Sequence, residues 1–171
     1  MTETISGSYL SLWYYVFSTN QSYLPKQGLS VRVLAVDFGL KRIGLAISDP
    51  MGTMALPYAT LVKKDNSQLM DEIQGIVDKE GVECLVVGLP MGLNGEETLT
   101  TRQARNFAGR LGRMTSLPVY LEDERLSSSE AALRLKSLGL TSRKHKKVLD
   151  QIAATIILES FLASQSARDC Q

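Results

Sequence analysis

Four acidic residues stand at the borders of apolar segments. Asp37 closes a β-branched apolar run, and Asp123 and Glu124 follow a second run of the same kind. Asp150 opens an apolar helical stripe near the end of the chain. A carboxylate beside a buried segment must be paired or bound to a metal, because its desolvation is otherwise costly. The four positions therefore predict a cluster of functional carboxylates.

The elements that must position these residues follow the order βββαβαβαα. Three strands joined by short connections predict an antiparallel meander, and strands that follow helices predict parallel pairing with right-handed crossovers. The expected strands cover about residues 31–36, 43–48, 54–61, 84–87 and 118–122, and the expected helices cover about residues 69–81, a segment capped by Asn94, 128–138 and 146–164. The pattern predicts an α/β fold with a five-stranded mixed sheet, three antiparallel strands followed by two parallel ones.

This topology brings distant acidic residues together. The carboxyl ends of the first, fourth and fifth strands share one edge of the sheet, which is where open α/β sheets bind ligands. Asp37, Asp123 and Glu124 fall at that edge, whereas Asp49 is expected to be a turn residue at the opposite edge. Asp150 shares the helical stripe that faces the sheet. Its alternative interpretation is a helix N-terminal Asp stabilised by the helix dipole.

Carboxylates gathered at one point repel one another and raise each other's pKa values. Two divalent cations about 3.5–4 Å apart relieve such repulsion and activate a phosphodiester for attack by water. Because the expected ligands are the oxygens of Asp37, Asp123, Glu124 and Asp150, the site favours Mg²⁺ or Mn²⁺. His145 is the only histidine, so a Ser-His-Asp triad and a zinc hydrolase are poorly supported.

Basic residues are concentrated around these acidic positions. The residues expected to contact phosphate groups are Lys41, Arg42, Arg125, Arg143, Lys144, Lys146 and Lys147. Such contacts would bind the backbone of a nucleic acid without reading its sequence. The alternative is a solvated charged face of no functional consequence.

Composition describes an ordinary globular protein. The chain has 171 residues, of which 44% are hydrophobic and 22% charged, with a net charge of +1. A chain of this length predicts one domain, which we expect over residues 31–165, with a poorly ordered extension over 1–30 and a short tail over 166–171. The two cysteines have no partner spacing and are expected to be reduced thiols, which favours a cytoplasmic location. An alternative is a plastid or mitochondrial targeting remnant in the extension, and no membrane span is expected.

Five sequence segments together carry a family resemblance. They are VDFGLKRIGLAISD, VVGLPMGLNGEE, RNFAGRL, DERLSS and KKVLDQIAATIILESFL. In this order and spacing they resemble the YqgF/RuvX family. The resemblance implies an RNase H-like fold with helices on both faces of the sheet. It also implies a nuclease linked to maturation of the 5′ end of pre-16S rRNA, a family that carries the older name of Holliday junction resolvase.

The resemblance implies metal-ligand and catalytic roles for Asp37, Asp150 and one acid of the pair Asp123 and Glu124, with Glu124 preferred. Related resolvases have an acid at the end of the fourth strand, where this chain has Gly88. The main functional prediction is a metal-dependent endonuclease that acts on structured RNA, in pre-ribosomal particles. The alternatives are a resolvase of four-way DNA, which requires a homodimer, a non-catalytic rRNA-binding module, and an ATP-binding protein.

Overall fold

The computed structural model describes residues 31–92, 94–124, 133–134, 136–137 and 146–169. Within them, one mixed sheet has the strand order β3-β2-β1-β4-β5. The strands are β1 (Val33–Phe38), β2 (Arg42–Ser48), β3 (Ala55–Val62), β4 (Cys84–Leu89) and β5 (Val119–Asp123). The helices are α2 (Asn66–Glu80), α3 (Leu99–Thr115) and α5 (Lys146–Asp169).

The pairing of the strands confirms the predicted topology. β1 pairs antiparallel with β2, and β2 pairs antiparallel with β3. On its other side β1 pairs parallel with β4, which in turn pairs parallel with β5. The carboxyl ends of β1, β4 and β5 therefore share one edge of the sheet, called the carboxyl edge below.

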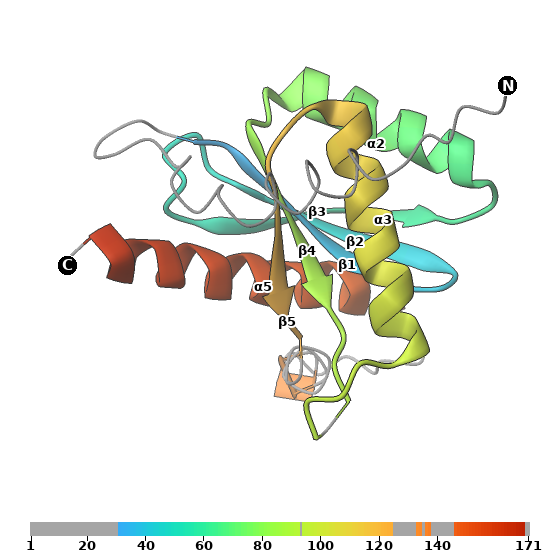
Figure 1. Cartoon of the computed structure of the whole chain (residues 1–171). Coiled ribbons are helices and arrows are strands. Elements are labelled where there is room, and N and C mark those ends of the chain that lie inside the picture. Colours follow the sequence, from blue (N-terminus) through green and yellow to red (C-terminus); the bar gives the residue numbers. More distant parts are fainter. Residues whose placement is uncertain (1–30, 93, 125–132, 135, 138–145, 170–171) are drawn as a thin grey trace, which may run out of the picture.

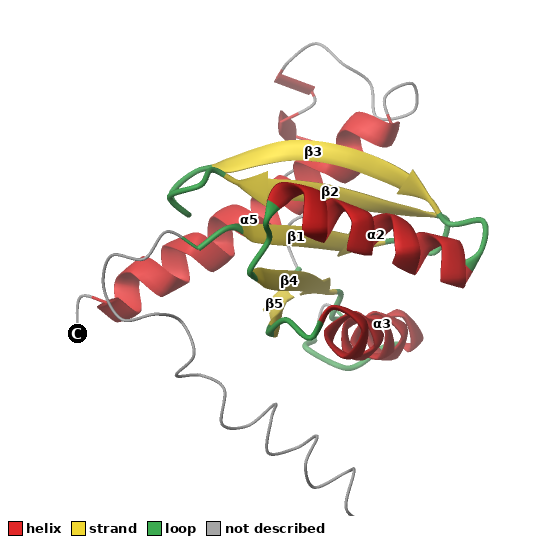
Figure 2. Cartoon of the chain, turned by 90° about the horizontal axis from the view of Figure 1, so that it is seen from above, coloured by secondary structure: helices red, strands yellow, loops and turns green. Residues whose placement is uncertain are grey.

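Helices cover both faces of the sheet, as Figures 1 and 2 show. Alternate residues of β1 face opposite sides: Leu34 and Val36 pack in a core with α2 and α3, whereas Val33 and Ala35 pack with α5. The apolar stripes predicted for the last two helices are buried. In α3 the stripe comprises Ala104, Phe107, Ala108 and Leu111, and in α5 it comprises Ala153, Ala154, Ile157 and Phe161.

Two helix boundaries differ from the predictions. The structure begins α3 at Leu99, not after Asn94, because Thr98 and Thr101 form a capping box that satisfies the first amide groups. The preceding segment folds back on itself, with Met91 bridged to Glu97. α5 continues to Asp169, beyond the predicted end at Ser164. The helix predicted over 128–138 lies largely outside the described residues, as do residues 1–30.

Side-chain contacts fix α5 against the sheet at both ends. Near its start, the Thr60 hydroxyl on β3 donates a hydrogen bond of 2.8 Å to the carbonyl of Lys147. Further along, the Ser160 hydroxyl donates to the carboxylate of Glu122 at 2.5 Å, and Tyr120 packs against Phe161 with ring centroids 5.3 Å apart. The start of α5 is thereby held over the carboxyl edge.

Candidate active site

Asp37 lies on the face of the sheet that α5 covers. It has the same parity along β1 as Val33 and Ala35, which pack against α5. It is the penultimate residue of β1, so the sequence placed it one residue too close to the strand end. Its carboxylate is partly buried. The side chain therefore points into the space between the carboxyl edge and the first turns of α5.

Gly44 allows α5 to bring Asp150 close to Asp37. Gly44 is directly opposite Asp37 in the β1–β2 register. A Cβ atom at this glycine would overlap the main-chain carbonyl of Asp150. A side chain in this buried strand would thus push the helix away, and glycine here marks a close approach of two backbones.

Gly88, on the other side of Asp37, also allows an acidic residue to come close. Val36 pairs with Val87, so the register places Gly88 next to Asp37 on β4. A Cβ atom at Gly88 would overlap the carboxyl group of Glu124 and the tip of Ile157. The absence of a side chain at the end of β4 is therefore what accommodates the Glu124 carboxyl.

Glu124 and Asp123 differ in how deeply they are buried. Glu124 is 8% exposed, whereas Asp123 at the end of β5 is exposed. The main-chain amide of Glu124 donates to the carbonyl of Leu89, which ties it to the end of β4. Glu124 is thus the buried member of the pair, and its preferred role as a metal ligand stays a prediction.

The acidic side chains perturb one another. Burial, followed by the charge of Asp150, raises the pKa of Asp37 to about 7. Burial, followed by the charges of Asp37 and Asp123, raises the pKa of Glu124 to about 8. Carboxyl groups in such surroundings hold protons near neutral pH, and a bound cation would release them.

Arg42 contacts Asp150 directly. Its Nε lies 2.5 Å from Oδ2 of Asp150, and a second guanidinium nitrogen lies 3.4 Å from Oδ1. Hydrogen bonding to Asp150 raises the pKa of Arg42, so the guanidinium stays charged. The sequence predicted a phosphate contact for Arg42, and this conformation gives it a carboxylate partner instead.

The donor types at the site suit a hard divalent cation, because all three inward-facing acids offer carboxylate oxygens. Burial and neighbouring negative charge raise the pKa values of Asp37 and Glu124, and a bound cation would relieve that cost. In the described part of the chain, no three His, Cys, Asp or Glu side chains are arranged to hold a metal ion in this conformation. The Asp150 carboxylate, which would complete the set with Asp37 and Glu124, is turned to Arg42.

The predicted basic residues are only partly within the described residues. Lys41 lies exposed in the β1–β2 turn, and Lys146 and Lys147 lie exposed at the start of α5. These three flank the carboxyl edge from two sides. The predictions for Arg125, Arg143 and Lys144 fall outside the described residues.

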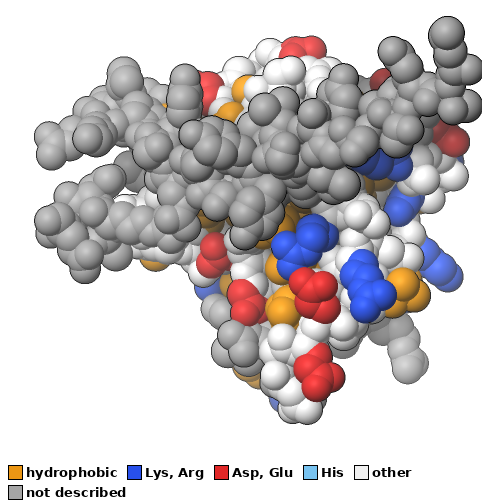
Figure 3. Space-filling view, in the orientation of Figure 1, with side chains coloured by type: hydrophobic (Ala, Val, Ile, Leu, Met, Phe, Trp, Pro, Cys, Tyr) orange, Lys and Arg blue, Asp and Glu red, His pale blue; other side chains and the backbone are white. Residues whose placement is uncertain are grey.

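Lys63 and Lys64 also lie at the carboxyl edge, and the sequence analysis missed them. They directly follow β3, and the amide of Lys63 donates to the carbonyl of Lys41. The Lys63 ammonium lies 4.7 Å from the centroid of the Phe38 ring, on the face of the sheet that α2 and α3 cover. The pairing of the third strand back onto the second was the signal that could have placed them here. On the face seen in Figure 3, Lys and Arg side chains lie beside Asp and Glu side chains among the described residues.

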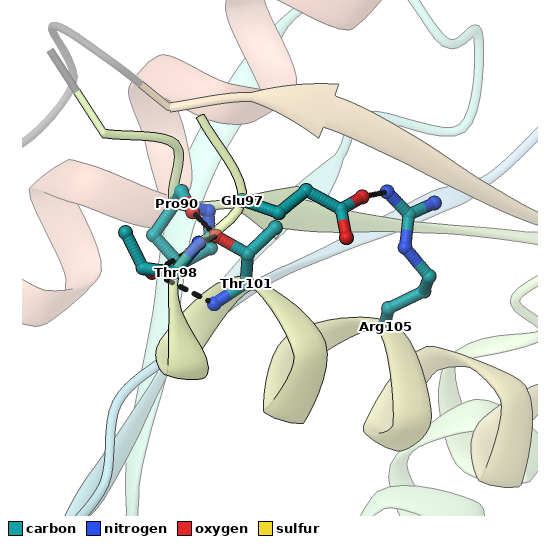
Figure 4. A network of polar contacts seen from close by, with 5 residues as sticks. All are labelled: Pro90, Glu97, Thr98, Thr101 and Arg105. Atoms are coloured by element: carbon teal, nitrogen blue, oxygen red, sulfur yellow. Dashed lines mark hydrogen bonds and ion pairs between the residues drawn. The ribbon is translucent and has the colours of Figure 1, made fainter. Parts of the chain in front are cut away.

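Polar contacts tie described residues between β4 and α3 to one another beside the site. Figure 4 shows that the Thr101 hydroxyl, part of the α3 capping box, donates to the carbonyl of Pro90. Arg105 contacts the Glu97 carboxylate at 2.5 Å across the same loop. These bonds fix the chain directly after Gly88, so the wall of the site at the end of β4 is preorganised.

Asp49 is a turn residue, as predicted. Its carboxylate accepts hydrogen bonds from the main-chain amides of Met51, Thr53 and Met54, and these bonds lower its pKa. It lies at the opposite edge from Asp37.

Among the described residues, no helix has the length and apolar character of a membrane span.

Known proteins resemble this chain in sequence over most of its length. The family model described as RuvX, Holliday junction resolvase, matches residues 31–164. A protein of Maridesulfovibrio salexigens named as a pre-16S rRNA nuclease is 51% identical over 133 residues, which are 78% of this chain and 98% of that protein. One of Oleidesulfovibrio alaskensis with the same name is 47% identical over 132 residues, or 77% of this chain and 92% of that one.

The fold also matches a solved structure. T. thermophilus RuvC in complex with a Holliday junction substrate aligns with a TM-score of 0.53 and 15% identity, over 80% of this chain and 96% of that one. At this identity the likeness concerns the fold, which is RNase H-like as the sequence predicted.

Proposed function

The chain belongs to the RuvX family, and on this premise we propose that it is a metal-dependent nuclease that processes the 5′ end of the small-subunit rRNA precursor. The names of the curated relatives support the RNA substrate. The single observation that carries the chemistry is the convergence of Asp37, Glu124 and Asp150 on one face of the sheet at the carboxyl edge.

Each of the three acids is carried by a different structural element, which favours different roles for them. Asp37 comes from the central strand, Glu124 from the segment after β5, and Asp150 from α5. We propose that these three carboxylates hold Mg²⁺ or Mn²⁺, with two ions in the active state. When bound, such ions activate water and stabilise the charge that develops on the phosphate. Asp37, held by the central strand of the sheet, is the residue whose position is least able to adjust.

The basic residues around the edge would hold the substrate. Lys41 and Lys63 are joined through their main chains, and Lys64 follows directly, so the three form one rim of the carboxyl edge. Lys146 and Lys147 form the other rim at the start of α5. We propose that the phosphodiester backbone crosses the site between these rims, held by charge rather than by sequence.

A second candidate is resolution of four-way DNA junctions. It is favoured by the family description and by the fold shared with a junction resolvase. Paired nicks across a junction require two active sites related by symmetry, and hence a homodimer. Gly88 stands at the end of β4, so the acid must come from the segment after β5 in either case.

The test compares two labelled substrates, a 5′ fragment of the small-subunit rRNA precursor and a four-way DNA junction. Each is incubated with the full chain in Mn²⁺, in Mg²⁺ and in EDTA. The same assays are run with Asp37→Asn, and with Asp71→Asn on the exposed side of α2 as the matched control.

Metal-dependent cleavage of the RNA, lost in Asp37→Asn and kept in Asp71→Asn, is the expected result. Symmetric nicking of the junction alone would replace the first candidate by the second. Cleavage by Asp37→Asn at the wild-type rate would refute a role for the carboxylate cluster.

A further inference from the structure

The side chains of Arg42 and Asp150 form an ion pair in this structure. The guanidinium makes a two-point contact with the carboxylate, with the shorter distance 2.5 Å and the longer 3.4 Å. The Asp150 side chain is 16% exposed and that of Arg42 is 31% exposed. This pair joins the first residue of β2 to the second turn of α5, over 108 residues of sequence.

The position of Arg42 is imposed by the sheet. Arg42 has the same parity along β2 as Gly44 and Ala46, and Ala46 packs in the core under α5. The side chain therefore rises on the α5 face, beside the carboxylate cluster. Its partial exposure leaves the guanidinium a path to solvent and to a ligand in front of the site.

One carboxylate cannot give the same oxygens to a guanidinium and to a metal ion. Asp150 is the third acid of the proposed metal set, and both of its oxygens face Arg42. The planar fork of arginine matches a carboxylate and a phosphate equally well. A phosphate of the substrate is thus a second partner of the same shape and charge for Arg42.

We propose that Arg42 is a built-in counter-ion that competes with the divalent cation for Asp150, and that a substrate phosphate draws it away. This inference rests on the proposed metal-dependent function. Phosphate binding and metal binding then favour each other, and thermodynamic linkage requires the effect to be reciprocal. The ion pair with Arg42 would keep Asp150 from acting as a metal ligand until a nucleic acid is present.

The first experiment measures Mn²⁺ binding to the metal-free full chain by titration calorimetry and by electron paramagnetic resonance. Arg42→Gln removes the charge and the fork while keeping much of the side-chain length. Lys41→Gln removes a neighbouring exposed charge that no ion pair joins to Asp150 among the described residues, so it controls for a general loss of positive charge. Arg42→Lys tests the fork with the charge retained, and thermal unfolding establishes that each variant is folded.

Arg42→Gln is expected to lower the Kd for Mn²⁺ about fivefold, the lower end of usual linkage between sites. Lys41→Gln should leave it within about twofold, which is the ordinary error of additivity. In an Asp150→Asn background the effect of Arg42→Gln should disappear. Equal gains from Arg42→Gln and Lys41→Gln, or a gain that persists without Asp150, would overturn the competition.

The second experiment adds a 2′-O-methyl oligonucleotide to the same titrations, and gel electrophoresis afterwards establishes that it is uncleaved. The oligonucleotide should tighten Mn²⁺ binding to the wild type and have little such effect on Arg42→Gln. Equal tightening in both proteins would overturn the phosphate-driven release. If the wild type binds Mn²⁺ and Arg42→Gln changes nothing, the inference fails and the proposed nuclease function stands. If no protein binds Mn²⁺ with or without the oligonucleotide, both fail.

Discussion

Replacing Asp37 by Asn should stabilise the metal-free protein at neutral and alkaline pH. Burial and the charge of Asp150 place the pKa of Asp37 at about 7, against an ordinary value of 3.8. At about 1.36 kcal/mol for each pKa unit, ionising Asp37 in the folded protein costs at most about 4 kcal/mol. An amide at this position has the same shape and no charge to desolvate.

The sign of the pH dependence follows from the raised pKa. The folded protein binds the proton of Asp37 more tightly than the unfolded chain does, so this contribution to stability is fully present below pH 3.8. It is lost as the pH rises through about 7. The stability advantage of Asp37→Asn over the wild type should therefore grow by about 3 kcal/mol between about pH 5 and about pH 8.

The assay is urea unfolding in EDTA across this pH range, with Asp71→Asn as the control. Asp71 is exposed on α2, and its amide variant should follow the wild type at every pH. Addition of Mn²⁺ should reverse the order, because the ion would stabilise the wild type alone. An advantage of Asp37→Asn that is absent or independent of pH would refute the account of the Asp37 environment.

Further predictions concern the space around the site and the charge beside it. Gly88→Ala should abolish cleavage while leaving the far-ultraviolet circular dichroism intact, because the added methyl displaces the Glu124 carboxyl; Gly75→Ala, in open space on α2, should keep full activity. Cleavage at the wild-type rate by Gly88→Ala would count against a role for Glu124. Lys63→Gln should lower the slope of log binding constant against log salt by about 0.7 for single-stranded nucleic acid. Lys79→Gln, at the far end of α2, should not change that slope, and equal slopes for both variants would remove Lys63 from the proposed rim.

The topology was accessible from sequence because it depends on local patterns. The continuous apolar run at Val86 indicates a strand buried on both faces, and the stripe through Ile157 indicates a helix that packs on the sheet. Right-handed crossovers then leave few ways to order the strands. The turn role of Asp49 followed from the same reasoning, and the structure confirms it.

The parts that sequence reasoning missed depend on contacts between distant segments. The sequence-based preference for Glu124 over Asp123 had no geometric reason until the space that Gly88 leaves was known. Pairing Arg42 with Asp150 requires knowing that the start of α5 lies over β2. The predicted beginning of α3 was wrong for a local reason. Thr98 is as suitable a helix cap as Asn94, and a turn in the preceding loop decided between them.

The central claim is that Asp37, Glu124 and Asp150, from three separate elements, hold one divalent-metal site. The most direct measurement is an anomalous difference map at the manganese absorption edge, from crystals of the full chain grown with Mn²⁺ and an uncleavable oligonucleotide. The account predicts manganese density bounded by these three carboxylates, with Arg42 turned from Asp150 to a phosphate. Manganese bound elsewhere, with Arg42 still on Asp150, would contradict it.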